Sequence, residues 1–153
     1  MMRFTVIAVG RAKSGILRRL WQDYADRMHP PVRLKEIDDR RLGSTGERRR
    51  REAAALLAAV PSAARIVALD ERGQDLSSSQ IAKHLGTWRD AGQADVAFIL
   101  GGADGLDESV RAAAHLVLAM GRLTWPHMLA RAMVIEQIYR AQQILSGHPY
   151  HRD

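Results

Sequence analysis

The chain has 153 residues, of which 46% are hydrophobic, so it is long and apolar enough to form one domain around a single core. It contains no cysteine, which excludes disulfides, cysteine-based zinc sites and thiol nucleophiles. The 23 Lys and Arg residues exceed the 17 Asp and Glu residues and give a formal charge of +6, which favours a polyanionic partner, RNA or DNA first.

Residues 1–10 form the segment that most resembles a targeting signal. Thr5 interrupts its apolar stretch and Gly10 ends it, which is typical of a buried strand rather than of a signal peptide. No run elsewhere approaches the roughly 18 apolar residues that a membrane span needs. We therefore expect a soluble, cytoplasmic protein with no membrane partner.

Strand-like and helix-like segments alternate along the whole chain. In the first half we predict a strand over 3–9, a helix over 16–28 that stops before two prolines, a strand over 32–37 and a polar loop over 39–46. A helix follows that begins with a capping box of Ser44 and Glu47 and ends near 59. In the second half we predict strands over 65–69, 95–100 and 115–118, helices over 80–89, 107–114 and 127–145, and a loop over 120–126. This alternation predicts an α/β fold, with a mostly parallel sheet and helices on both faces, in a single domain over 1–153.

The last predicted helix, over 127–145, carries apolar residues around most of its circumference. A helix between a sheet and water would show one apolar stripe. We interpret the wider distribution as cover on two sides, and we predict a homodimer that supplies it.

The strand over 95–100 leads into a glycine-rich turn, Gly101-Gly102-Ala103-Asp104-Gly105. Glycines at that place let a ligand approach the backbone, whose free N–H groups can meet a phosphate, a carboxylate or an adenine nitrogen. The spacing is neither that of a dinucleotide fingerprint nor that of a P-loop. A tight turn without a ligand explains the pattern equally well.

A second candidate site lies where the loop over 120–126 enters the last helix. His127 and Arg131 are four positions apart and share one helical face, behind a proline that suits the first turn. An anion such as an RNA phosphate is favoured at that end of a helix. The simpler interpretation is one surface histidine and one solvated arginine.

The tail over 147–153 gathers His148, Tyr150, His151 and Arg152, which together offer proton exchange, base stacking and phosphate contact. Two histidines without a third ligand make a poor metal site, so no metal is expected. A chance cluster is the alternative, because terminal residues are usually frayed.

A run of arginines, Arg40-Arg41 and then 48–51, is the most basic part of the sequence. Four consecutive arginines on a helix point in four directions, so they cannot all serve one row of salt bridges. Such a dense cluster favours a phosphate-binding patch, with a solvated helix surface as the alternative for each member.

Together these motifs resemble one family over essentially the whole chain. The matching segments are, in order, 9–13, Tyr24, Arg27, 68–70, 99–106, 123–127, Arg131, 136–141 and 148–152. The family is that of the bacterial large-subunit rRNA pseudouridine N3-methyltransferases (the RlmH family), within the SPOUT methyltransferases. The resemblance implies an α/β sheet whose C-terminal part forms a trefoil knot, and a homodimer that builds the active site between its subunits.

Carried over position by position, the resemblance implies two sets of site residues. The pocket for the cofactor S-adenosylmethionine would be lined by Leu69, Gly101, Gly102, Gly121, Arg122, Leu123, Thr124, Trp125 and Pro126. The catalytic, substrate-binding side would hold His127, Arg131, Tyr150, His151 and Arg152.

The resemblance also implies the reaction, methyl transfer from S-adenosylmethionine to N3 of a pseudouridine in 23S rRNA of the assembled ribosome. His127 or His151 would accept the N3 proton, because a histidine titrates near neutral pH. The alternatives are a knotted methyltransferase that acts on tRNA, and a non-catalytic RNA- or ribosome-binding protein. A non-catalytic RNA-binding protein would explain the positive charge, but it does not explain the glycine turn, the Pro-His loop and the tail together.

Overall fold

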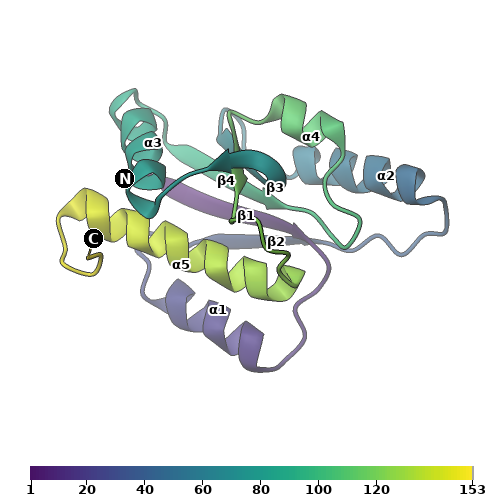
Figure 1. Ribbon diagram of the computed structural model, residues 1–153, viewed down its shortest axis with the longest axis horizontal. Helices are drawn as coiled ribbons and strands as arrows, with labels where there is room; N and C mark the ends of the chain where they lie inside the picture. The colour runs from purple at the N-terminus through teal and green to yellow at the C-terminus, as the bar shows by residue number, and fades with distance from the viewer. Residues whose placement is uncertain (153) are drawn as a thin grey trace.

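The order of strands and helices follows the predicted alternation over residues 1–152, which the computed structural model describes (Figure 1). The elements are β1 (Arg3–Val9), α1 (Ile16–Asp26), β2 (Arg33–Ile37), α2 (Thr45–Ala58), β3 (Arg65–Asp75), α3 (Ser78–Asp90), β4 (Asp95–Leu100), α4 (Glu108–Ala113), β5 (Leu116–Ala119) and α5 (His127–Ser146). Asp153, which the predicted domain and tail include, lies outside the described residues.

The strands form one five-stranded sheet in the order β2-β1-β4-β3-β5, and all neighbouring pairs are parallel. Successive side chains of a strand point to opposite faces, so the sheet has two cores. Phe4, Val6 and Phe98 belong to the first core, under α1, α3 and α5, whereas Ile7 and Ile99 belong to the second, under α2 and α4. The predicted α/β fold with helices on both faces is confirmed.

The connections between strands share one hand. Those that run toward the β2 edge, from β1 to β2 and from β3 to β4, carry α1 and α3 on the first face of the sheet. Those that run toward the β5 edge carry α2 and α4 on the second face. Uniform handedness is expected of parallel βαβ units. The C-terminal trefoil knot stays a prediction from the family resemblance.

Two predicted helix boundaries were wrong, each for a local reason. The helix over 16–28 ends at Asp26, and Met28 is buried beyond it. The helix predicted from residue 80 begins at Ser78, because Ser77 and Gln80 form a complete capping box. At α2 the Ser44 hydroxyl accepts a hydrogen bond from the Glu47 N–H, which is the one half of the predicted box that forms among the described residues.

The largest difference concerns β3, which was predicted to end at residue 69 and continues to Asp75. Its pairing with β5 shifts register between Leu69 and Gln74, so the strand bulges away and then rejoins its neighbour. Gly73 makes this possible, because a Cβ there would lie 2.6 Å from the carbonyl carbon and oxygen of Val117. A glycine between polar residues gave no strand signal in the sequence.

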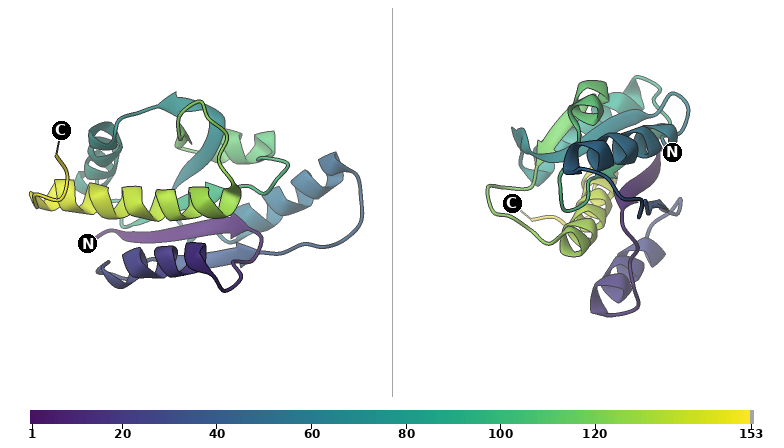
Figure 2. Two further views of the ribbon diagram at one scale, coloured as in Figure 1. Left: turned by 60° about the horizontal axis from the view of Figure 1, so that its bottom comes forward. Right: turned by 90° about the vertical axis from the view of Figure 1, so that its right-hand side faces the viewer.

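Helix α5 lies on the first face of the sheet and packs against α1 and α3 (Figures 1 and 2). Its buried residues are Arg131, Ala132, Val134, Ile135, Ile138 and Ala141. The sheet and two helices of the same chain therefore cover much of the circumference that we interpreted as an interface. The homodimer stays a prediction.

Candidate functional site

The bulged middle of β3, the carboxyl end of β4 and the loop after β5 line one cavity of about 680 Å³. Ligands of parallel α/β sheets bind at this edge, and the volume lies within the range of small-molecule sites. Of the residues predicted to bind a cofactor, six line the cavity: Leu69, Gly101, Gly102, Thr124, Trp125 and Pro126. The structure thus brings together three segments that are far apart in the sequence.

A second, smaller cavity of about 180 Å³ adjoins the first across Leu69, which lines both. Gly121 lines this smaller cavity, together with apolar residues of β4, β5 and α5. Arg122 and Leu123 are exposed and line neither cavity. The Trp125 ring N–H donates to the Met120 carbonyl at 2.9 Å and so closes the loop in which they lie.

The glycine turn is tightly packed beneath the cavity. A Cβ on Gly101 would lie 2.9 Å from the carbonyl carbon and oxygen of Gly105, and one on Gly102 would lie 3.0 Å from the Val9 side chain. Gly102 and Gly105 also form an isolated antiparallel bridge. The backbone itself is therefore the surface that the turn offers to a ligand.

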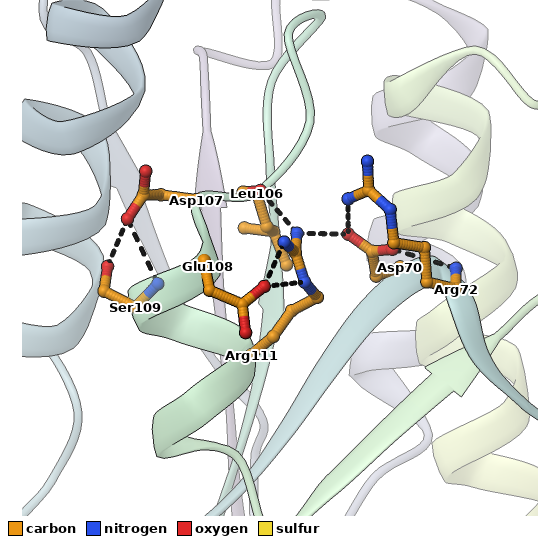
Figure 3. Close-up of polar contacts among 7 residues, drawn as sticks. All are labelled: Asp70, Arg72, Leu106, Asp107, Glu108, Ser109 and Arg111. Carbon is orange, nitrogen blue, oxygen red and sulfur yellow. Dashed lines mark hydrogen bonds and ion pairs between the residues drawn. The ribbon is translucent and has the colours of Figure 1, made fainter.

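Asp70 and Arg111 join the bulged middle of β3 to α4 (Figure 3). The Arg111 guanidinium lies 3.3 Å from the Asp70 carboxylate, donates to the Leu106 carbonyl at 2.8 Å, and pairs with Glu108. The Asp70 side chain is only 6% exposed. This contact fixes the bulge of β3 relative to the residues that follow the glycine turn.

His127 is the first residue of α5, is exposed, and lines the large cavity. It also lines a groove of about 650 Å³ on its other side, which Arg131 and the segment after β1 share. The predicted common face of His127 and Arg131 is confirmed in that groove. His127 therefore lines both spaces, and its contact with a substrate stays a prediction.

Arg131 is buried, in contrast to the exposed arginine of the simpler interpretation. Its guanidinium donates to the Glu36 carboxylate at 2.7 Å and to the Gly10 carbonyl at 3.3 Å. Burial raises the pKa of Glu36, but the hydrogen bonds from the Ala12 N–H and from Arg131 outweigh it and lower this pKa overall. The substrate contact predicted for Arg131 stays a prediction, and the observed role is to hold α5 on β1 and β2.

The C-terminal tail folds back onto the second half of α5. The Tyr150 hydroxyl donates to the Glu136 carboxylate at 3.1 Å, and the Tyr150 ring packs edge-on against Tyr139 and under the Arg140 guanidinium. Burial, the Tyr24 hydroxyl and the Glu136 charge raise the pKa of Tyr150, so its phenol stays protonated at neutral pH. The tail is an ordered part of the fold and not a frayed end.

His151 also contacts α5, through Arg140, and in addition reaches α3. One ring nitrogen lies 3.1 Å from the Arg140 guanidinium and the other 3.4 Å from the Ser79 hydroxyl, at the start of α3. Arg152 is exposed. The tail thus lies at one end of α5 and His127 at the other.

The arginine run divides into paired and unpaired members. Arg41 and Arg51 share Asp39, and Arg48 pairs with Asp104 of the glycine turn at 3.1 Å. Arg49 lines the large cavity, and its Nε is buried without a hydrogen-bond partner among the described residues. Arg41, Arg48 and Arg51 are thus engaged in ion pairs, and the phosphate-binding patch stays a prediction.

Among residues 1–152, no helix is long and apolar enough to span a membrane. The same residues contain no group of three or more His, Asp or Glu side chains that could hold a metal ion.

A parallel α/β sheet with a ligand-sized cavity at one edge is the architecture in which many α/β proteins bind their ligands. The family described as "Predicted SPOUT methyltransferase" matches residues 2–151, so the chain belongs to the SPOUT methyltransferase family. Relatives named "Ribosomal RNA large subunit methyltransferase H" are 58% identical in Rhodospirillum centenum and 50% identical in Paramagnetospirillum magneticum, and each alignment covers 99% of both chains. A solved structure, a probable methylase family protein from Haemophilus influenzae, has the same fold with a TM-score of 0.60 at 11% identity, over 99% of this chain and 71% of the other.

Proposed function

We propose that this chain transfers a methyl group from S-adenosylmethionine to N3 of a pseudouridine in the 23S rRNA of the ribosome. The observation that carries the proposal is the cavity beside the bulge of β3 and the end of β4, lined by six of the predicted cofactor residues in a SPOUT methyltransferase. The names of the full-length relatives, which specify the RNA of the large ribosomal subunit, support the substrate.

The residues present fit this cofactor. Its adenine needs hydrogen bonds from backbone groups on a close surface, and Gly101 and Gly102 offer that surface because side chains there would collide with neighbouring atoms. Trp125 adds an aromatic wall, and Arg49 adds a guanidinium for a carboxylate or a phosphate. When bound, S-adenosylmethionine supplies an activated sulfonium methyl group, so the protein contributes mainly orientation and a path for a proton.

The proton of N3 must leave during the reaction, and two histidines are the candidate acceptors. His127 lines the cavity, and His151 lies in the tail with its ring between Arg140 and Ser79. Tyr150 is an unsuitable base because its pKa is raised. It would instead orient or stack on the base of the substrate.

One chain does not bring all these groups to one nucleotide. Tyr150 and His151 contact α5 at Glu136 and Arg140, about 14 and 20 Å along the helix axis from His127 at 1.5 Å per residue. A second copy that places its tail beside the first copy's cavity would complete the site. Exposed apolar residues, Ile16 and Leu20 on α1 and Leu123 and Trp125 before α5, are available for such a contact.

The experiment measures transfer of labelled methyl from S-adenosylmethionine to three substrates taken from cells that lack this protein: assembled ribosomes, stripped 23S rRNA and tRNA. We expect label in the 23S rRNA, most strongly in assembled ribosomes. Label in tRNA alone would show that the substrate is tRNA and not 23S rRNA, as the first alternative holds. If the protein fails to bind S-adenosylmethionine, the alternative that remains is a non-catalytic RNA-binding protein.

A further inference from the structure

Glu136 and Arg140 form an ion pair on one face of α5, four positions apart. The Glu136 Oε1 accepts two hydrogen bonds from Arg140, one from Nε at 3.0 Å and one from Nη2 at 2.6 Å. Two bonds to one carboxylate fix the orientation of the planar guanidinium. The remaining nitrogen, Nη1, faces the C-terminal tail.

This pair contacts both tail side chains that the proposed reaction needs. The Tyr150 hydroxyl donates to the same Glu136 oxygen at 3.1 Å, and the Arg140 guanidinium carbon lies 4.9 Å from the centre of the Tyr150 ring. The Arg140 Nη1 lies 3.1 Å from the Nδ1 of His151. Because α5 places Glu136 and Arg140, the helix also places the two tail residues.

The contact with Arg140 decides which nitrogen of the His151 ring carries the proton. A guanidinium has only donors, so the His151 Nδ1 accepts the hydrogen bond and must be unprotonated. In the neutral ring the hydrogen then lies on Nε2, which is 3.4 Å from the Ser79 hydroxyl oxygen and donates toward it. The structure therefore presents His151 as a hydrogen-bond donor whose acceptor nitrogen is already occupied.

A donor and a proton acceptor have different effects on the proposed substrate base. The N3 of a pseudouridine lies between two carbonyl groups, and loss of its proton puts negative charge on their oxygens. An N–H aimed at one of these oxygens stabilises that charge. The His151 Nε2–H can supply this hydrogen bond when a carbonyl oxygen replaces the Ser79 hydroxyl. The proton of N3 needs another acceptor, and of the two candidate histidines this leaves His127, which lines the cavity.

We propose that Arg140, itself oriented by Glu136, is a positioning residue that holds His151 as a neutral hydrogen-bond donor to a carbonyl of the substrate base, so that His127 accepts the N3 proton. The inference rests on the proposed function for its substrate, but the contact between Arg140 and His151 exists without one. It can therefore be tested on the protein alone and again in the reaction.

The first readout is the tautomer of His151, measured by long-range ¹H–¹⁵N spectra of the ligand-free full chain with ¹⁵N-labelled histidine. At about pH 8 an ordinary histidine is neutral, and the signals that disappear in H151Q assign those of His151. We expect an unprotonated Nδ1 in the wild type and in R89M, a control at an exposed arginine of α3, but a mixture of tautomers in R140M. A protonated Nδ1 in the wild type, or the wild-type tautomer in R140M, would overturn the proposal.

The second readout compares turnover on ribosomes with the dissociation constant of S-adenosylhomocysteine. R140M should slow methyl transfer at least about tenfold and change that constant less than about twofold. E136Q keeps an acceptor oxygen for Arg140 and should retain more activity than E136A. H151Q keeps an amide N–H in place of the Nε2–H and should be more active than H151A, whereas H127Q should lose activity because an amide does not accept a proton. Equal losses in H151Q and H151A would overturn the donor role.

Failure of this proposal and failure of the proposed function give different results. A wild type that transfers no methyl group to RNA would overturn the proposed function, whereas the tautomer of His151 in the ligand-free protein still confirms or overturns the role of Arg140. Circular dichroism shows whether R140M folds. If it does not fold, E136Q, E136A and H151Q, which all keep the arginine, carry the test.

Discussion

Arg131 and Glu36 form an ion pair of 2.7 Å between α5 and β2, although they are 95 positions apart in the sequence. The Arg131 side chain is 4% exposed and that of Glu36 is 29% exposed. The same guanidinium contacts the end of β1 through the Gly10 carbonyl. The contact therefore fixes the start of α5, and with it His127, against the sheet.

Replacing Arg131 by methionine should destabilise the fold. Removal of one partner leaves a carboxylate that is largely shielded from water, and the free energy of unfolding should fall by about 3 kcal/mol. Urea denaturation measures this change, and R122M on an exposed loop residue serves as the control with little effect. If R131M keeps wild-type stability and loses only methyl transfer, Arg131 contacts the substrate, as the family resemblance implied.

Replacing Gly73 by alanine should weaken the pairing of β3 with β5. The new Cβ would lie 2.6 Å from backbone atoms of Val117, which cannot move aside as a side chain can. We expect a loss of about 1–3 kcal/mol, the usual cost of overpacking. G46A, in the first turn of α2 with its nearest contact at 3.4 Å to the tip of Arg50, should be neutral or stabilising. Equal stability of G73A and the wild type would contradict the close approach.

His115 should make the stability depend on pH. Its Nδ1 accepts a hydrogen bond from the Ile66 N–H at 2.9 Å, which requires an unprotonated nitrogen, and burial followed by the Arg65 charge lowers the pKa of His115. Below the unfolded pKa of about 6.5 the unfolded state binds more protons, so stability should fall as the pH falls from there through the lowered folded-state value. Comparison of H115N with the exposed control H148N at pH 5.5 and 7.5 measures this. An unchanged pH dependence in H115N would exclude His115 as the cause.

Replacing Trp125 by phenylalanine should weaken cofactor binding. The change removes the hydrogen bond to the Met120 carbonyl that closes the loop along the large cavity. Loss of about 1 kcal/mol corresponds to about fivefold weaker binding of S-adenosylhomocysteine. L123A, on an exposed neighbour that lines neither cavity, is the matched control. Equal effects of W125F and L123A would contradict the assignment of the cavity.

Changes in the tail should affect turnover but not cofactor affinity. Y150F removes the donor to Glu136, and H151A removes the imidazole beside Arg140. We expect at least about tenfold slower methyl transfer for one of them, as for loss of a proton acceptor or of substrate orientation, with H148A as the exposed control in the same tail. If the affinity for S-adenosylhomocysteine falls as much as the turnover, the tail belongs to the cofactor pocket instead.

The elements that could be predicted from the sequence are those with a local signal. The periodicity of β1 and β4, the N-cap of α2 at Ser44 and the glycine turn each depend on residues a few positions apart. Leu69, Gly102 and Trp125 were predicted for one site through the resemblance to a family, and they line one cavity. Composition and spacing alone offered only a weak signal for that site.

What escaped prediction depends on distant contacts. The extension of β3 becomes visible only when Gly73 is seen against Val117 of a strand more than 40 residues later. From the sequence, Arg131 could be interpreted as a solvated arginine on the face of His127. Its burial depends on the ion pair with Glu36, a residue of a distant strand.

The most direct test of the central claim compares the nucleosides of 23S rRNA by mass spectrometry, from cells that lack this protein, from the same cells supplied with it, and from cells supplied with the Y150F/H151A variant. We predict that one N3-methylated pseudouridine is absent from the first sample, restored in the second and reduced in the third. Identical 23S rRNA nucleosides in all three samples would contradict the account.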